Sequence, residues 1–229
     1  MYNNKNNKMQ YNYNNNILVS IEGNIGSGKS TLLEKCKNIF GKKNIVFLQE
    51  PVGKWETIKD ENGIAMIEKF YENQEKYGFS FQMMAFTTRL ADIKRAFKEN
   101  TNSIIISERS LYTDRYVFAQ MLYDDKKIEN VNFQIYLQCY EEFIVDFPVE
   151  FIIYVKTNPL ICHERIMKRA RIGEDVIPIE YLTNCHKYHE SFLETMTMPK
   201  LVLDGNQSIF ENPSVLNSWF EKITSLLSL

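Results

Sequence analysis

A glycine-rich segment near the amino terminus constrains the fold of this chain more than any other feature. Residues 23–30 read Gly-Asn-Ile-Gly-Ser-Gly-Lys-Ser and fit the pattern G-x-x-x-x-G-K-[S/T] at every fixed position. An apolar run at residues 17–21 precedes the segment, and a helical pattern at residues 29–40 follows it. A phosphate-binding loop requires this strand–loop–helix context, because backbone N–H groups and the helix amino terminus attract phosphate. The segment therefore predicts a site for ATP or GTP.

Two side chains of this loop have expected roles. Lys29 is expected to reach the β- and γ-phosphates, and the Ser30 hydroxyl is expected to hold Mg²⁺. A chance glycine-rich turn is the alternative, and the full match between a strand and a helix argues against it. The predicted nucleotide contacts in this loop are Gly23, Asn24, Ile25, Gly26, Ser27, Gly28, Lys29, Ser30 and Thr31.

Beyond the loop, short apolar runs alternate with helical patterns. Together with the phosphate-binding loop, such alternation predicts an α/β fold of the P-loop type, with three layers in which a five-stranded parallel sheet is flanked by helices. Further strands are expected at 44–49, 103–107, 151–155 and 201–204, and helical stretches at 63–100, 111–123, 131–147, 179–196 and 213–229. Asn158 and Pro159 are expected to begin one more helix, which is basic.

Composition excludes several classes of protein. The 229 residues include 27 Lys and Arg and 29 Asp and Glu, so no broad basic surface is available for a nucleic acid polymer. No apolar stretch approaches the ~18–20 residues of a membrane span. The four cysteines lack a C-x-x-C pair, so neither a disulfide framework nor a zinc framework is expected. We predict a cytoplasmic protein.

The first sixteen residues differ from the rest, since eight are Asn and almost none is apolar. Such a segment cannot offset its ordering entropy by burial, so we predict a disordered tail at residues 1–16 and a single domain at residues 17–229. The tail lacks Arg and an apolar core region, so it resembles neither a secretory signal nor a typical transit peptide.

Charged residues follow several predicted strands, at the sheet edge where ligands of open α/β folds bind. Glu50 follows the second strand, and Glu108 with Arg109 follows the third. A kinase acting on a small hydroxyl substrate needs a base, an acid near Mg²⁺ and a cation on the transferred phosphate. Glu50, Glu108 and Arg109 are candidates for these roles in that order. Solvated glutamates and a structural Arg109 ion pair are the alternative.

The predicted basic helix follows the fourth strand. Arg165 and Arg169 are four residues apart on one face, and Arg171 lies at the helix exit. A lid that closes over a transferring phosphate supplies such cations and excludes water. A solvated basic face is the alternative, but the position of the cluster in the predicted fold and the nearby Glu174 favour an Arg-rich lid.

Several motifs occur together in one order along the chain: Ile21 to Thr31, Glu50-Pro51-Val52 with Trp55, Tyr71 eleven residues before Gln82, Glu108-Arg109-Ser110 with Asp114-Arg115-Tyr116, the three lid arginines, and Ile177 to Leu182 leading to His186 and His189. From residue 17 to the carboxyl terminus, this set resembles the deoxyribonucleoside kinases of the deoxycytidine, deoxyguanosine and deoxyadenosine kinase type. The resemblance implies Mg²⁺- and ATP-dependent phosphorylation of the 5′-hydroxyl of a deoxyribonucleoside, as in nucleotide salvage.

The resemblance also implies roles for individual residues. Glu50 would be the general base, Arg109 the cation beside the hydroxyl and the incoming phosphate, and Glu108 the Mg²⁺-linked acid. Tyr71 and Glu174 would bind the sugar 3′-hydroxyl, and Gln82 would read the base edge. The residues expected around the base are Val52, Trp55, Ile67, Phe81 and Phe118, and those expected near the phosphate donor are Arg165, Arg169, Arg171, Asp204 and Gln207, the last two in a loop over 204–211.

Base preference is expected to depend on Arg89 and Asp114. In the family that this chain resembles, an Arg and an Asp at these two positions accompany purine or cytidine nucleosides as substrates. The two side chains occupy space that the thymine methyl group requires. This favours deoxyadenosine or deoxyguanosine, with deoxycytidine also open, unless the pair is purely structural. Met83 departs from the family pattern, which implies a small residue there.

Two other classes of protein compete with this interpretation. A nucleoside monophosphate kinase of the thymidylate kinase type also has a phosphate loop and an Asp-Arg-Tyr element, but its acceptor would favour a cation where Glu50 stands. A GTPase switch would require an N-K-x-D-like motif, which we do not find.

The resemblance further implies a homodimer formed through helices near 80–98 and 131–147. No histidine suggests itself as a nucleophile or base.

Overall fold

A parallel sheet of five strands forms the centre of the molecule. The computed structural model describes residues 15–41, 43–171, 174, 176–210 and 212–228. Within them the strands lie in the order β2-β3-β1-β4-β5, and every pair is parallel. The strands are β1 (Ile17–Glu22), β2 (Ile45–Leu48), β3 (Ile104–Glu108), β4 (Val149–Lys156) and β5 (Lys200–Asp204).

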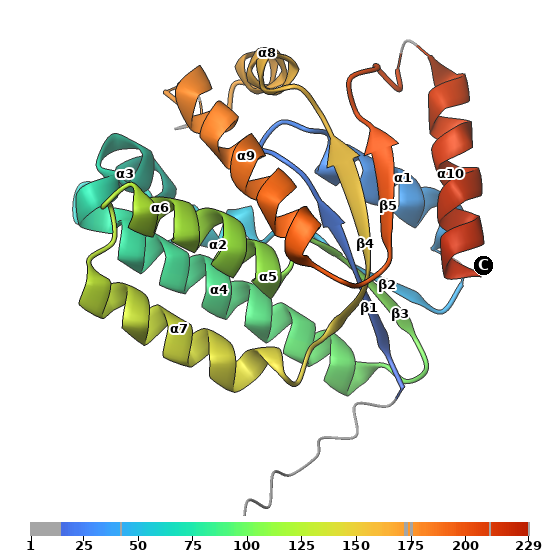
Figure 1. Cartoon of the computed structure of the whole chain (residues 1–229), viewed down its shortest axis with the longest axis horizontal. Coiled ribbons are helices and arrows are strands. Elements are labelled where there is room, and N and C mark those ends of the chain that lie inside the picture. Colours follow the sequence, from blue (N-terminus) through green and yellow to red (C-terminus); the bar gives the residue numbers. More distant parts are fainter. Residues whose placement is uncertain (1–14, 42, 172–173, 175, 211, 229) are drawn as a thin grey trace, which may run out of the picture.

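Helices cover both faces of the sheet and make the three layers that the sequence predicts (Figure 1). One face carries α1 (Lys29–Phe40) and α10 (Pro213–Leu227). The other face carries the longer helices α4 (Gln74–Glu99), α7 (Asn130–Ile144) and α9 (Ile179–Thr195), together with the short segments α2 (Val52–Trp55), α3 (Met66–Glu72), α5 (Leu111–Thr113), the π-helix η1 (Asp114–Ala119) and α6 (Gln120–Asp124). Helix α8 (Pro159–Arg169) follows β4.

Alternate residues of the strands separate the two cores. Val19 and Ile21 pack in the cluster that contains α1 and α10, whereas Leu18 packs in the cluster on the opposite face. The same division holds for Ile106 and Ile105 in β3. Because both faces are buried, these strands are continuous apolar runs instead of alternating patterns.

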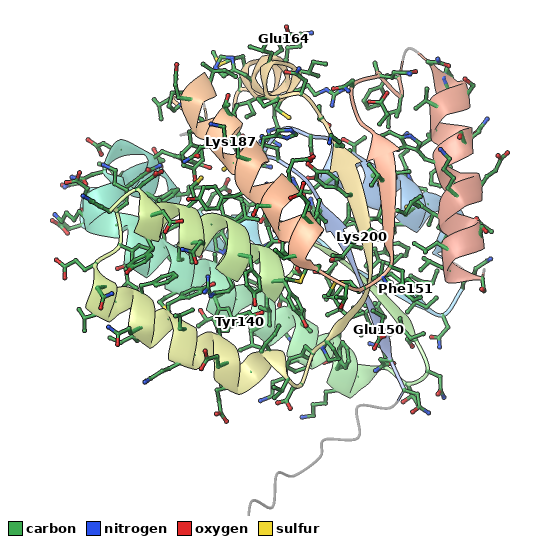
Figure 2. All side chains as sticks on the ribbon, in the orientation of Figure 1. Tyr140, Glu150, Phe151, Glu164, Lys187 and Lys200 are labelled. Carbon is green, nitrogen blue, oxygen red and sulfur yellow. The ribbon has the colours of Figure 1, made fainter. Side chains whose placement is uncertain are left out.

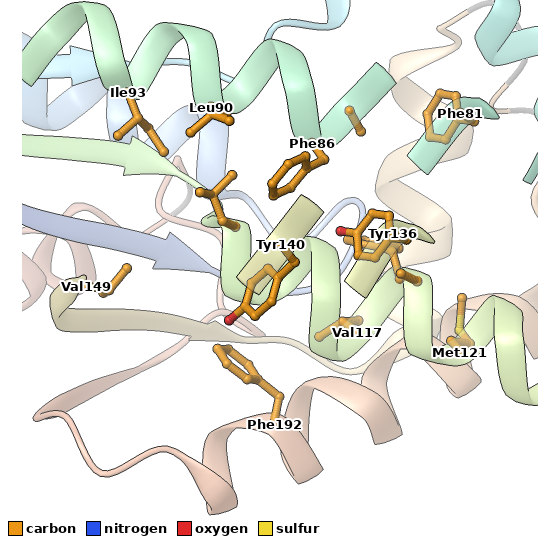
Figure 3. Close-up of a cluster of buried hydrophobic side chains, with 14 of the residues drawn as sticks. Phe81, Phe86, Leu90, Ile93, Val117, Met121, Tyr136, Tyr140, Val149 and Phe192 are labelled. Carbon is orange, nitrogen blue, oxygen red and sulfur yellow. The ribbon is translucent and has the colours of Figure 1, made fainter. Parts of the chain in front are cut away.

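The larger core fixes η1 against the helices around it. Phe86 of α4 meets Tyr136 of α7 edge to face at 5.7 Å, and Tyr116 of η1 stacks on Phe192 of α9 at 6.0 Å. Figure 3 shows Val117 of η1 among these side chains. This packing fixes the position of η1, the segment that carries Asp114 and Phe118.

The structure differs from the predicted elements in four respects. The helical stretch expected at 63–100 is two helices, because Asn73 has a non-helical backbone (φ −146°, ψ 87°) and its side chain accepts a hydrogen bond from the N–H of Lys76, which caps α4. The helix expected at 131–147 ends at Ile144, because β4 begins at Val149. Neither α2 nor the π-helix was expected.

The predicted tail lies largely outside the described residues, which begin at Asn15. The Asn16 side chain donates to the carbonyl groups of Phe97 and Asn100 and accepts from the N–H of Ser103. Asn16 therefore attaches the start of β1 to the end of α4 and the start of β3. Among the described helices, none is long and apolar enough to cross a membrane.

Candidate active site

The carboxyl ends of the strands open into a cavity of about 910 Å³. The phosphate loop, Glu50 after β2, Glu108 at the end of β3 and α8 after β4 surround it. In Figure 2, Glu164 marks α8 on this side of the sheet. All predicted site residues line the cavity except Gly23, Asn24 and Asp204. Parallel strands therefore bring together residues that lie far apart in the sequence.

The phosphate loop has the backbone that its glycines permit. Gly26 and Gly28 have φ angles of 77° and 101°, and Gly28 is the N-cap residue of α1. A Cβ atom at Gly26 would lie 2.5 Å from the carbonyl oxygen of Cys162 in α8. The Arg165 Nη1 group donates to the carbonyl oxygen of Ser27 at 3.3 Å. The loop and the basic helix are thus in direct contact.

Lys29 lies buried at the floor of this loop, where its Nζ donates to the carbonyl oxygen of Asn24 at 2.7 Å. Asn24 in turn donates to the carbonyl oxygen of Leu182 at 2.8 Å. Burial, with the neighbouring Arg109 cation, lowers the pKa of Lys29 to about 8. Phosphate anions would oppose this shift, so the site is electrostatically prepared for a polyanion.

Glu50 is held between two guanidinium groups. Its Oε1 lies 2.9 Å from Arg89 Nη2 and 3.1 Å from Arg109 Nε. Burial favours the neutral carboxyl, but Arg109, Arg89 and Lys29 outweigh it and lower the pKa of Glu50 to about 2. The carboxylate is therefore ionised throughout the physiological range, as a proton acceptor must be.

Arg89 connects Glu50 to Asp114. Its Nε lies 2.9 Å from Asp114 Oδ2, and its Nη1 donates to the carbonyl oxygen of Glu108 at 2.7 Å. Arg89 and Asp114 are nearly inaccessible to solvent, at 3% and 2% exposed. The predicted ion pair is present, and it extends to Glu50, a link that the sequence did not suggest.

Glu108 and Ser30 supply oxygen atoms beside the phosphate loop. The Ser30 hydroxyl donates to Glu108 Oε1 at 2.6 Å, and Glu108 Oε2 accepts from the Glu50 N–H at 3.4 Å. Mg²⁺ prefers hard oxygen ligands and is usually bound by one or two protein groups together with substrate phosphates and water. A hydroxyl and a carboxylate in contact fit such an ion.

Aromatic side chains form the opposite end of the cavity. Phe81 stacks on Phe70 at 4.2 Å and meets Trp55 edge to face at 5.5 Å. Gln82 is 2% exposed and lines the cavity beside them. An apolar, aromatic-lined end of a cavity with the Gln82 amide in its wall suits a planar heterocycle. The predicted residues Val52, Ile67 and Phe118 also line this cavity.

Sequence reasoning missed several lining residues. Phe70, Ala85 and Tyr181 line the cavity. Phe70 and Ala85 could have been inferred from their helical spacing to predicted residues, whereas no such signal indicated Tyr181. Met83 is partly buried against the core and is not one of the described lining residues, so the departure at this position falls outside the cavity wall.

The predicted lid is held by one carboxylate. Glu174, which is 4% exposed, pairs with Arg169 and lies 3.1 Å from Arg171 Nη1. Burial, with the negative charge of Glu174, raises the pKa of Tyr71, so its hydroxyl stays protonated and can donate. Residues 172, 173 and 175 of this segment lie outside the described residues.

The loop after β5 borders the same cavity. The Asp204 carboxylate accepts from the Asn206 N–H at 3.0 Å and so shapes the turn, while Gln207 lines the cavity. Phe210 is 73% exposed at its rim, with Lys35 Nζ 6.0 Å from the ring centre. Residue 211, the end of the predicted loop, lies outside the described residues.

The chain matches the family model described as deoxynucleoside kinase over residues 19–228. It belongs to the deoxynucleoside kinase family. The resemblance found in the sequence is thereby confirmed, and the monophosphate-kinase and switch alternatives are not supported. This kinase phosphorylates deoxynucleosides, with ATP as the phosphate donor that the family implies.

Individual relatives are similar to the kinase over most of its length. A probable deoxycytidine kinase of fowlpox virus (strain NVSL) is 32% identical over 218 residues, covering 92% of this chain and 88% of that protein. Human deoxycytidine kinase is 31% identical over 240 residues, covering 92% and 90%. Human mitochondrial thymidine kinase 2 is 32% identical over 196 residues, covering 82% and 71%. These names include kinases for different bases.

Proposed function

We propose that Glu50 takes the proton from the 5′-hydroxyl of a deoxyribonucleoside as that oxygen attacks the γ-phosphorus of ATP. The new bond joins the 5′-oxygen to phosphorus, the bond to the β,γ-bridging oxygen breaks, and ADP leaves. The observation that carries this assignment is the ionised Glu50 carboxylate between Arg89 and Arg109 at the mouth of the phosphate loop.

The low pKa of Glu50 is compatible with a role as base. Phosphoryl transfer acidifies the attacking hydroxyl as the new bond forms, so a weak base suffices late in the reaction. Bound phosphates would also compete for Lys29 and Arg109, two of the cations that lower the pKa of Glu50. The carboxylate therefore gains proton affinity when both substrates are present.

The other site residues stabilise charge and hold the substrates. Lys29 and Arg109 face the transferring phosphate, and Arg165, Arg169 and Arg171 add positive charge when the lid closes. Ser30 and Glu108 would hold Mg²⁺, which when bound neutralises phosphate charge and orients the triphosphate. Tyr71 and Glu174 bind the 3′-hydroxyl, and Gln82 reads the base edge.

We further propose that the kinase disfavours thymidine and prefers deoxyadenosine or deoxyguanosine. Support comes from the buried Arg89–Asp114 pair, which supplies polar groups beside the base and leaves little room for a methyl group. Deoxycytidine is a second candidate acceptor, because two of the relatives named above are deoxycytidine kinases. A cytoplasmic location and a homodimer remain predictions.

One experiment tests these assignments. Purified kinase is given ATP, Mg²⁺ and the four natural deoxynucleosides, each at the same concentration, and the monophosphates are quantified. We expect Glu50→Gln to lower kcat by about 100-fold or more and to leave the Kd for ATP within about threefold. Glu72→Gln, at an exposed glutamate of α3, is the matched control. Near-normal turnover by Glu50→Gln would remove Glu50 as the base, and thymidine as the best acceptor would refute the preference.

A further inference from the structure

His189 is a buried histidine that the proposed reaction does not use. It lies in α9 with 0% exposure, and it is not one of the described residues that line the cavity. Its Nδ1 is 2.8 Å from the carbonyl oxygen of Cys185, one helical turn earlier. Its Nε2 is 3.3 Å from Arg109 Nη1. One buried ring thus joins α9 to the cation that faces the transferring phosphate.

The two contacts determine which ring nitrogen carries the proton. A carbonyl oxygen can only accept a hydrogen bond, so Nδ1 is the donor to Cys185. Nε2 of the neutral ring then has a free lone pair, and Arg109, which has only donors, gives it a hydrogen bond. A doubly protonated ring would set an N–H group against the guanidinium. Burial and the Arg109 charge hold the pKa of His189 well below its usual range, which keeps the ring neutral.

Arg109 needs fixed partners, because its backbone is unusual. Its φ angle is 65°, a left-handed conformation that is costly for a side chain of this size. Its Nε pairs with Glu50 and its Nη1 donates to the carbonyl oxygen of Gly23 at 2.9 Å. The guanidinium carbon also lies 4.7 Å from the centre of the Phe118 ring. Among the described residues, none hydrogen-bonds to Nη2, so this group is available to a ligand.

We propose that His189 is a positioning residue for Arg109: its neutral Nε2 accepts a hydrogen bond from Nη1 and thereby orients Nη2 toward the transferring phosphate. The inference rests on the proposed role of Arg109. Gly23 and His189 occupy Nη1 from two directions, while Glu50 occupies Nε, so the plane of the guanidinium is defined. Without the histidine acceptor, the plane can rotate about the remaining contacts, and the loss falls on the transition state.

Three substitutions separate the hydrogen-bond acceptor of His189 from the packing of its ring. His189 stacks on Tyr154 with ring centres 6.4 Å apart and meets Phe118 edge to face at 6.1 Å. His189→Phe keeps an aromatic ring in this space but removes the acceptor. His189→Gln loses the ring but can place an amide oxygen near the position of Nε2. His189→Asn carries the same amide group and is too short to reach that position.

The experiment measures kcat, both KM values and the thermal midpoint for these variants. We expect His189→Phe and His189→Asn to lower kcat by about 10- to 100-fold, with KM for ATP and for the deoxynucleoside changed by less than about threefold. His189→Gln should recover most of the lost kcat. His186→Gln, at a half-buried histidine of the same helix, is the matched control and should keep wild-type kcat.

The ranking of the variants decides the question. A purely packing role predicts the reverse order, with His189→Phe close to wild type and His189→Gln impaired, and that order would overturn the proposal. If His189→Phe does not fold, equal kcat for His189→Gln and His189→Asn overturns it instead. Arg109→Ala is measured in parallel. Wild-type kcat in Arg109→Ala would refute the proposed role of Arg109, whereas a loss there with the reverse histidine ranking would refute only the role of His189.

Discussion

Arg89 is the residue at which base recognition and proton transfer meet. Its guanidinium contacts Asp114 on one side and Glu50 on the other. We expect Arg89→Met combined with Asp114→Ala to raise kcat/KM for thymidine relative to deoxyadenosine by about tenfold or more, because space opens beside the base. The same variant should lose kcat for every substrate, because Glu50 loses one of its two guanidinium partners.

Asp114→Asn is the control for this pair. The amide keeps the size of the side chain and leaves the contact between Arg89 and Glu50 in place, so kcat should fall less than in the double variant. Steady-state kinetics with the four deoxynucleosides measure both effects. If the double variant keeps the wild-type order of substrates, the pair is structural and does not select the base.

At the level of single residues, local motifs identified the phosphate loop and the charged side chains at strand ends. Those positions are set by short-range pattern, so a sequence reveals them. The contacts between Arg109 and His189, and between Arg89 and Glu50, join residues that lie 80 and 39 positions apart. No periodicity encodes such pairs, since only the fold brings them together.

At the scale of elements, Gly26 couples the phosphate loop to α8. Its left-handed backbone alone should make Gly26→Ala less stable by about 1–2 kcal/mol, and the added Cβ would collide with Cys162. We expect α8 and its arginines to shift away from the loop, which weakens ATP binding. Urea unfolding and ATP titration measure the two effects.

Gly53→Ala serves as the stability control for this prediction. A Cβ atom at Gly53 would meet no described atom within 4 Å, and its φ is not left-handed. The free energy of unfolding should therefore be unchanged or slightly increased. Equal stability of Gly26→Ala and the wild type would show that the loop and α8 yield more easily than their contact suggests.

Elements with strong periodicity were predictable, and short ones were not. The five strands are apolar runs, and the Asn158 side chain accepts from the Leu160 N–H to cap α8 as expected. The break at Asn73 involves neither Pro nor Gly, so the sequence reads as one long helix. The π-helix η1 depends on packing against α4 and α9, which no local rule describes.

At the scale of the whole molecule, exposed apolar side chains on the outer surface of α7 lead us to predict that the kinase associates with a second copy of itself. Val131, Ile135 and Phe143 are 58%, 45% and 37% exposed, and with Cys139 they follow one another at four-residue intervals. Such spacing places them along one side of the helix. Helix α7 lies beside α4 at the edge of the molecule (Figure 1).

We therefore expect light scattering to give a mass of two 27.0 kDa chains. Ile135→Asp should shift the kinase toward the monomer, because a carboxylate would be buried without a partner at the interface. Val202→Asp, at a residue of β5 that is 53% exposed, tests whether any new surface charge has this effect. A monomeric wild type, or equal dissociation in both variants, would contradict a dimer through α7.

If the dimer forms through α7, the partner subunit covers α4 from outside, while the inner side of α4 carries Phe81, Gln82 and Arg89. Substitutions at the interface should therefore alter KM for the deoxynucleoside more than KM for ATP.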